Sequence, residues 1–217
     1  MKLCILAVTR NKSISVKTLH TLLCFNMNAM KNNVSLQLSF VDDDPFLRSD
    51  IITKHLKVFD RIVLIDYSIN MDIKSIEKCF LPIEHGQHCI VFPGVKEGID
   101  WDLFKTKIKN GIDEPIEQMG LNFDTEVSKK LGESLYTVKN TIPSAFVFDC
   151  KPVLKNLKDK KSGSVKIPPK KSDMFEKFIT SGVKVCAFTG AKLITTYSHE
   201  CLGNILNMSG VSTNAST

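Results

Sequence analysis

Phe59-Asp-Arg-Ile-Val-Leu-Ile-Asp-Tyr-Ser-Ile-Asn-Met-Asp72 is the stretch on which our interpretation of the whole chain depends. Its apolar run at residues 62–65 is typical of a strand buried on both faces of a sheet. Asp66 follows that run at once, so we expect it at the edge where open α/β sheets bind ligands. The pattern also fits an ordinary strand whose aspartate caps the next helix, which we expect over residues 73–80.

The length and composition of the chain are those of a globular domain. Its 217 residues stand at the upper end of the range for one domain, and 43% of them are hydrophobic. No apolar stretch approaches the roughly 20 residues that a membrane span requires, and residues 3–8 are too few for the apolar core of a signal peptide. We therefore expect one soluble domain over residues 1–208 and a disordered polar tail at 209–217.

The cysteines bear on the compartment. There are seven of them, an odd number, without any C-x-x-C spacing, and most lie inside apolar runs as small hydrophobic residues would. This usage indicates a reducing environment. We predict a cytoplasmic protein.

Lysines contribute much of the net charge of +6, and many of them fall in one part of the chain. They are Lys155, Lys158, Lys160, Lys161, Lys166, Lys170 and Lys171. Because no aromatic residue interleaves with them, a surface for stacking bases is not supported, and we expect no nucleic-acid partner. Residues 158–171, with Gly163 and two prolines, predict a flexible, solvated loop. The alternative is a surface that attracts a phosphorylated or acidic ligand.

Strands and helices alternate along the first half of the chain. The expected strands are residues 2–8, 34–41, 62–65, 89–92, 146–148, 183–188 and 193–196, and helices are expected between most of them. Right-handed parallel crossovers would bring the ends of the first three strands to one edge. Residues 111–138 look like an insertion with one weak strand at 134–138. We predict an α/β single domain with a central, mostly parallel mixed sheet of about six strands flanked by helices.

Five blocks of sequence occur in an order that is similar to a known family. They are Ile5-Leu-Ala-Val-Thr-Arg-Asn11, Val41-Asp42-Asp43, the stretch quoted above, Pro143-Ser-Ala-Phe-Val-Phe-Asp149, and the region from Asp173 to His199. In this order they resemble the GT-A (Rossmann-like) glycosyltransferases, which transfer a sugar from a nucleotide diphosphate donor. Residues 14–20 and 92–101 further resemble the capsid-glycan glycosyltransferases of chlorella viruses and related large DNA viruses.

The resemblance implies where the donor would bind. Asp42 and Asp43 match the carboxylates that meet the base and ribose of the donor, with Thr9 and Arg10 in the first loop. The fixed fork of N–H donors on an arginine suits a phosphate or a base carbonyl. Asp100 and Trp101 are assigned to the sugar pocket.

Trp101 equally fits simple packing on the helix that follows it. The sequence leaves this choice open.

The resemblance also implies a divalent cation. In the family, an Asp-x-Asp pattern holds a metal against the diphosphate, which the metal neutralises as it leaves. This chain has Asp66-Tyr67-Ser68 there, so a weaker hydroxyl ligand stands in place of the second carboxylate. The implied metal ligands are Asp66, Ser68 and His199. Imidazole suits Mn²⁺ better than Mg²⁺, so manganese is expected, with magnesium as the alternative.

Two further carboxylates are candidates for the catalytic step. A carboxylate within hydrogen-bond reach of the acceptor hydroxyl can take its proton. Asp173 matches the family's general base, although it also fits a helix cap. Asp149 is the second candidate, either on the acceptor side or on the other face of the sugar in a retaining reaction.

These patterns together predict a metal-dependent glycosyltransferase. Its donor would be a UDP-sugar and its acceptor a glycan or glycoprotein, as in viral capsid glycan synthesis. The missing second carboxylate leaves open a non-catalytic nucleotide-sugar-binding module. A third interpretation, nucleic-acid binding through the lysines, predicts a steep dependence of binding on salt.

Overall fold

The computed structural model describes residues 1–159, 162–192, 194 and 197–209. Its centre is a sheet of eight described strands in the order β2-β1-β3-β7-β4-β8-β6-β5. The strands are β1 (Lys2–Thr9), β2 (Ser35–Asp42), β3 (Arg61–Ile65), β4 (Cys89–Phe92), β5 (Thr125–Gly132), β6 (Leu135–Thr141), β7 (Ala145–Asp149) and β8 (Val185–Phe188). The α-helices are α1 (Val16–Lys31), α2 (Pro45–His55), α3 (Ile73–Phe80), α4 (Trp101–Lys109), α5 (Cys150–Leu157), α6 (Lys171–Thr180) and α7 (Tyr197–Met208), and a short 3-10 helix, η1, spans Ile116–Gln118.

The sheet is mixed, with most of its described strands in one direction. β1 pairs in parallel with both β2 and β3, and β4 pairs in parallel with β8. β7 runs antiparallel between β3 and β4, and β6 runs antiparallel to both β8 and β5. Only β6 and β7 of the described strands therefore oppose the others. The predicted α/β fold is confirmed, with eight strands in place of about six.

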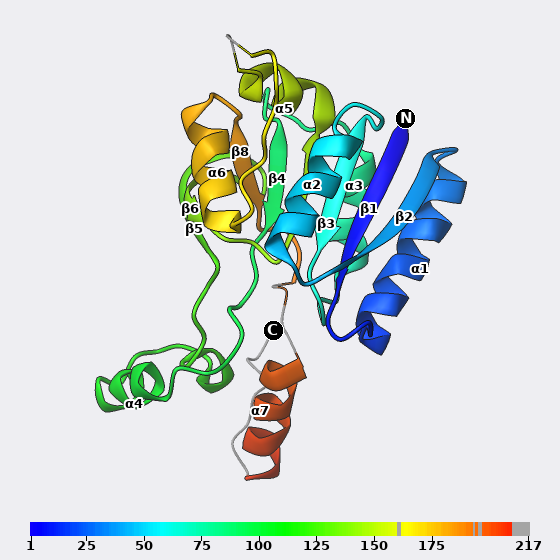
Figure 1. Cartoon of the computed structure of the whole chain (residues 1–217). Helices are drawn as coiled ribbons and strands as arrows, with labels where there is room; N and C mark the ends of the chain where they lie inside the picture. The colour runs from blue at the N-terminus through cyan, green and yellow to red at the C-terminus, as the bar shows by residue number, and fades with distance from the viewer. Residues whose placement is uncertain (160–161, 193, 195–196, 210–217) are drawn as a thin grey trace.

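Helices cover both faces of the sheet (Figure 1). On one face, Leu22 and Phe25 of α1 and Ile76 of α3 pack on the strands. On the other, α2, α5 and α6 pack, the last through Phe175 and Phe178. Because both faces are covered, the central strands are apolar throughout, which is why residues 62–65 show no polar alternation.

Side-chain caps begin several of the helices. Ser15 accepts the Thr18 N–H at the start of α1, and Asp44 accepts two N–H groups at the start of α2, whose first residue is a proline. Asp72 accepts the Ser75 N–H at 2.9 Å and caps α3. The aspartate that caps the helix after the central strand is thus Asp72, and Asp66 is left for another use.

The predictions for residues 111–138 and for the C-terminal region were incomplete. β5 and β6 belong to the edge of the main sheet, and most of β5 is exposed, so no apolar run marks it. Helix α7, Tyr197–Met208, was not predicted, although it lies within the domain expected over residues 1–208. Of the predicted strand at 193–196, only Ile194 is described, and it bridges to Gly94 in parallel. Of the predicted tail, residues 210–217 lie outside the described residues.

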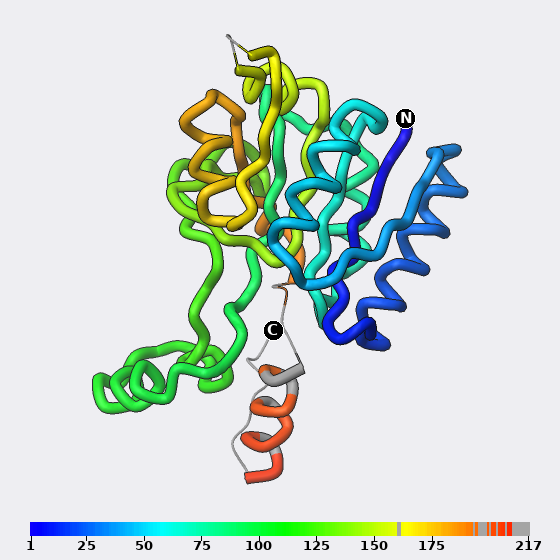
Figure 2. The backbone as a smooth tube through the Cα atoms, viewed as in Figure 1, coloured from blue at the N-terminus to red at the C-terminus, as the bar shows by residue number. Residues whose placement is uncertain are grey.

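Helices α4 and α7 project from the sheet on the side where β4 ends (Figures 1 and 2). No residue of α4, all of which is described, is buried. α7 contacts the short helix η1, which belongs to the same projection. This part of the molecule is therefore anchored to the sheet through the segments that lead to and from α4.

The lysine-rich segment is anchored in its second half. Ile167 is only 4% exposed, and its carbonyl accepts a hydrogen bond from the Ser49 hydroxyl of α2. The Arg48 guanidinium donates to the Pro169 carbonyl at 3.0 Å. One apolar side chain and two side-chain donors therefore connect this half of the predicted loop to α2. Residues 160 and 161 lie outside the described residues.

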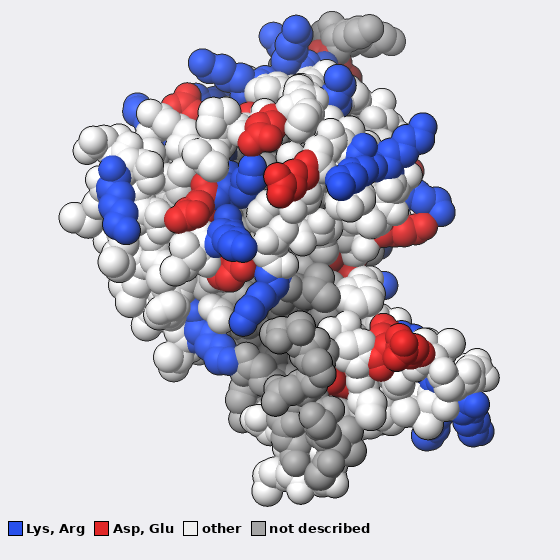
Figure 3. Space-filling view, turned by 180° about the vertical axis from the view of Figure 1, so that it is seen from behind, with Lys and Arg blue, Asp and Glu red and all other residues white. Residues whose placement is uncertain are grey.

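Three further features concern the surface charge, the cysteines and the possibility of a membrane-spanning helix. On the face seen in Figure 3, basic and acidic side chains alternate and do not form one continuous basic area. The seven cysteines are all free thiols. In the described part of the chain, no helix combines the length and apolar character needed to cross a membrane.

Candidate functional site

The ends of three parallel strands meet at one edge of the sheet. In the register, Thr9 of β1 lies opposite Asp42 of β2, and Ala7 lies opposite Ile65 of β3. The Thr9 hydroxyl donates to Asp42 Oδ1 at 3.1 Å, and the Asp43 N–H donates to the Thr9 carbonyl at 2.9 Å. The predicted convergence of the first three strands is therefore confirmed.

A cavity of about 220 Å³ opens at this edge. Its charged lining residues are Arg10, Asp43, Arg48, Asp66, Glu97 and Lys171. They come from six places in the fold: the ends of β1, β2, β3 and β4 and the starts of α2 and α6. Three cationic and three acidic side chains thus face one small space.

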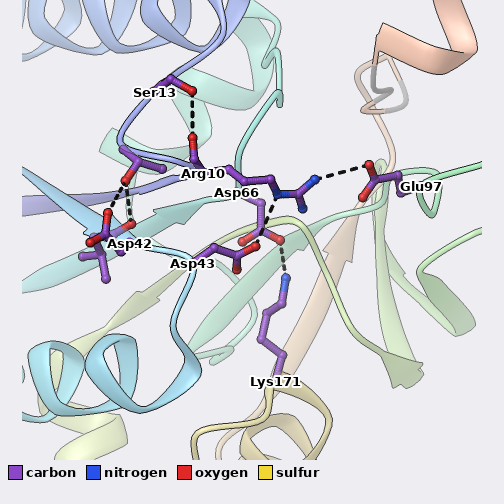
Figure 4. A network of polar contacts seen from close by, with 9 residues as sticks. Arg10, Ser13, Asp42, Asp43, Asp66, Glu97 and Lys171 are labelled. Atoms are coloured by element: carbon purple, nitrogen blue, oxygen red, sulfur yellow. Dashed lines mark hydrogen bonds and ion pairs between the residues drawn. The ribbon is translucent and has the colours of Figure 1, made fainter.

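Arg10 links three of these segments (Figure 4). Its guanidinium lies 3.4 Å from a carboxylate oxygen of Asp43 and 3.4 Å from one of Glu97, and it stacks over the Tyr67 ring at 5.3 Å. The Glu97 carboxylate is the main reason that the pKa of Arg10 is raised, with Asp43 adding to it. Since 46% of the Arg10 side chain is exposed, these pairs add little to stability, and the guanidinium remains accessible to a ligand.

Asp66 forms an ion pair with Lys171, the first residue of α6 (Figure 4). The Lys171 ammonium donates to Asp66 Oδ2 and also to the Pro143 carbonyl at 3.2 Å. Burial raises the pKa of Asp66 above its usual value, and the Lys171 charge offsets part of that rise. The two side chains are only 21% and 16% exposed, so removal of either one would leave a largely buried charge without its partner.

Asp124 is a buried carboxylate that connects two loops beside the cavity. It is 5% exposed, accepts the N–H groups of Gly94 at 3.0 Å and Ser144 at 3.3 Å, and accepts the Thr125 hydroxyl at 2.7 Å. Burial raises the pKa of this carboxyl, and the hydrogen bonds lower it in part. Asp124 thus joins the loop after β4 to the loop before β7, where Ser144 lines the cavity.

Asp124→Ala should lower the free energy of unfolding by about 2–4 kcal/mol, because two buried N–H groups lose their acceptor. Urea unfolding followed by far-UV circular dichroism measures this. The control is Asp102→Ala, since the Asp102 side chain is 97% exposed, and its effect should be about 0.5 kcal/mol or less. A loss for Asp124→Ala no larger than that of the control would contradict the supporting role.

Asp149, the second candidate for the catalytic step, lies at the edge of the sheet opposite the cavity. β7 runs antiparallel to β3, so Asp149 pairs with Arg61 at the beginning of β3, and Asp66 follows the other end. Its carboxylate accepts from Arg61 Nε at 2.7 Å. The direction of β7 therefore separates Asp149 from the cavity and gives it a structural role.

Three other candidate residues, Asp173, Asp100 and Trp101, do not line the cavity. Asp173 is exposed in the first turn of α6, two residues after Lys171, and accepts from the Ser172 hydroxyl at 2.8 Å. Asp100 caps α4, and Trp101, 53% exposed, packs edge-on against Phe104. The role of Asp173 as general base, and the roles of Asp100 and Trp101 in the sugar pocket, remain predictions.

The three predicted metal ligands are not gathered into a carboxylate-rich site. Ser68, half-buried, has a left-handed backbone with φ of 63°. His199 Nε2 donates to the Gly98 carbonyl at 3.1 Å, which ties α7 to the loop before α4. Around Asp66 the charged neighbours are the cations Lys171 and Arg48 and one further carboxylate, Asp43. No three His, Cys, Asp or Glu side chains of the described residues are placed to hold a metal ion. This donor set does not fit a divalent cation.

Sequence reasoning missed three residues of this edge: Arg48, Asp124 and Lys171. Lys171 was counted in the lysine-rich segment, and its only distinguishing signal is that it begins a helix. Asp124 follows no apolar run and precedes an exposed strand, so nothing local marks it as buried. These contacts join residues far apart in the chain.

Comparisons with known proteins give distant structural similarities. No family model and no curated protein matches the chain. A Drosophila β-1,4-galactosyltransferase 7 mutant, in complex with manganese, UDP-Gal and xylobiose, is 10% identical with a TM-score of 0.46 over 88% of this chain and 66% of that one. The inositol-1-phosphate CTP transferase of T. maritima is 12% identical, with a TM-score of 0.46 over 97% of each chain. A glycosyltransferase involved in glycosylation of the major capsid of PBCV-1 is 9% identical, with a TM-score of 0.40 over 95% of this chain and 98% of that one.

Proposed function

We propose that this protein is a GT-A glycosyltransferase that takes a UDP-sugar donor and transfers the sugar to a glycan or glycoprotein. The observation that carries the proposal is the cavity at the carboxyl ends of β1, β2 and β3, where carboxylates and cations face each other. A nucleoside diphosphate needs both kinds of group. Its ribose hydroxyls and base N–H donate to carboxylates, and its phosphate oxygens accept from arginine and lysine.

The two kinds of group are separated in a way that suits this ligand. Asp42, held by the Thr9 hydroxyl, ends β2, and Asp43 follows it. Asp66 follows β3 and pairs with Lys171 of α6. Arg10 lies between them through its contact with Asp43. The base and ribose would therefore meet the aspartates after β2, and the diphosphate would lie toward Arg10 and Lys171. The order of the five sequence blocks supports the same assignment.

In transfer, Asp173 would act as the general base. Its carboxylate is exposed, and it lies in the same helical turn as Lys171, so an acceptor at the mouth of the cavity could reach it. Asp100 and Trp101 would contact the sugar from the segment that leads into α4. The groups around Asp66 do not suit a divalent cation, so the proposed transfer proceeds without the predicted manganese. We further propose that the acceptor is a viral capsid glycoprotein, on the basis of the sequence resemblance alone.

Isothermal titration of the full chain with UDP tests the donor site. Arg10→Ala should weaken UDP binding by about tenfold, because one charge-assisted hydrogen bond to the nucleotide is lost. The control is Lys54→Ala, an exposed lysine of α2 away from the cavity, which removes the same charge. Absence of UDP binding to the unmodified chain would overturn the proposal, as would equal weakening by both variants.

Release of UDP from UDP-sugars tests the catalytic part separately. Slow hydrolysis of at least one donor, reduced about a hundredfold or more by Asp173→Asn, is expected for a transferase whose base is Asp173. UDP binding without turnover of any donor would instead favour the alternative, a nucleotide-sugar-binding module.

A further inference from the structure

The position of a metal next to Asp66 is already taken by a side chain of the same protein. Lys171 donates to the Asp66 carboxylate and to the Pro143 carbonyl, and both members of the ion pair are largely buried. The start of α6 fixes the lysine backbone, and the Arg48 contact with Pro169 fixes the residues just before it. The ammonium is therefore a built part of the site.

A divalent cation at Asp66 would have to displace or approach this ammonium. Like charges a few ångströms apart repel strongly in a partly buried site. Three cationic side chains line the cavity against three acidic ones, so no excess of carboxylates is present to attract a metal. The Lys171 ammonium can instead donate a charge-assisted hydrogen bond to a phosphate oxygen.

The Lys171 ammonium also has enough N–H donors to bind a phosphate oxygen. An ammonium has three N–H donors, and the contacts described for Lys171 use two of them. The third can donate to a phosphate oxygen. Because Asp66 and Pro143 hold the ammonium in place, little rotational freedom is lost when the ligand binds.

We propose that Lys171, positioned by Asp66, neutralises the donor diphosphate in place of a metal ion, so that the donor binds without any divalent cation. This inference rests on the proposed function. In transfer, the acceptor oxygen bonds to the anomeric carbon, and its proton passes to a carboxylate. The bond from that carbon to the diphosphate oxygen breaks, both electrons go to that oxygen, and the ammonium offsets the charge that develops there.

Isothermal titration with UDP in EDTA and again in Mn²⁺ tests the inference on the unmodified full chain. We expect the two dissociation constants to agree within about twofold, which is less than 0.5 kcal/mol. Binding that requires Mn²⁺, or that Mn²⁺ tightens by about tenfold or more, would overturn this inference and leave the proposed function standing. No binding under either condition would overturn the proposed function itself.

Variants in EDTA test the lysine. Lys171→Met should weaken UDP binding by about tenfold or more, and Lys171→Arg, which keeps the charge, should lose less. The matched control is Lys170→Met, which removes the same charge from the exposed neighbouring residue and should change little. Equal weakening by Lys170→Met would show a general charge effect and overturn the inference.

A double variant tests the same inference if the single variant Lys171→Met does not fold. Asp66→Asn with Lys171→Met removes both charges, so no buried charge is left without its partner. Circular dichroism checks that this variant is folded before titration. If it then bound UDP in EDTA as tightly as the unmodified chain, Lys171 would not be the counter-charge for the diphosphate.

Discussion

Lys171→Met should lower the free energy of unfolding by about 3 kcal/mol, because the Asp66 carboxylate would stay partly buried without its cation. Both side chains of the pair are less than a quarter exposed, at 21% and 16%, so water can replace the lost partner only in part. Urea unfolding at neutral pH measures the loss. Lys170→Met should change the same quantity by about 0.5 kcal/mol or less, because its side chain is at the surface.

The loss caused by Lys171→Met should depend on pH in a defined direction. Burial raises the pKa of Asp66 in the folded protein above its ordinary value of 3.8. A group with a raised folded pKa costs stability at high pH, and the cost disappears as the pH falls through the folded pKa toward the unfolded one. Without Lys171 that cost grows. The difference between variant and unmodified chain should therefore be largest near neutral pH and narrow on acidification, and a difference that widens would contradict the pairing.

Arg61→Met should lower the free energy of unfolding by about 3–5 kcal/mol. Arg61 is 5% exposed, pairs with Asp149 at 2.7 Å, and donates to the carbonyls of Cys79 at 2.8 Å and Leu81 at 2.6 Å. The variant leaves one carboxylate and two carbonyls without this donor. UDP binding by the folded variant should be unchanged, because the contacts lie at the edge opposite the cavity.

Two further variants test whether the pair of Arg61 and Asp149 acts in stability and not in turnover. Asp149→Asn keeps an oxygen that can accept from Arg61, so it should cost only about 1 kcal/mol and leave turnover of the donor unchanged. Lys155→Met, at an exposed position of α5, serves as the control for stability. Loss of turnover in a folded Asp149→Asn protein would contradict the structural role that we assign to this carboxylate.

The sequence predicted the part of the fold that has local signals. Helix α3 and strand β4 have the predicted bounds, and the strand before Asp66 was recognised from its apolar run and charged flanks. Parallel crossovers then predicted that Thr9, Asp42 and Asp66 follow strands that end at one edge. Each of these inferences needed only neighbouring residues and a general rule of chain direction.

The errors arose where the structure depends on distant contacts. No residue of β7 shows whether it runs with or against β3, so Asp149 was expected near the cavity when it lies at the other edge. The Lys171 contact with Asp66 spans 105 residues, and a lysine that forms it looks in the sequence like its solvated neighbours. Burial of one charge among several could be learned only from the packing of α6 and α2.

The most direct test of the site is a crystal structure of the full chain with UDP in EDTA. We expect diphosphate oxygens within about 3 Å of Lys171 Nζ and the Arg10 guanidinium, with the nucleoside at Asp42 and Asp43. UDP elsewhere, for example in the 670 Å³ cavity lined by His20 and other residues, would contradict it. So would a structure with Mn²⁺ in which the metal joins Asp66 to the diphosphate and Lys171 is displaced.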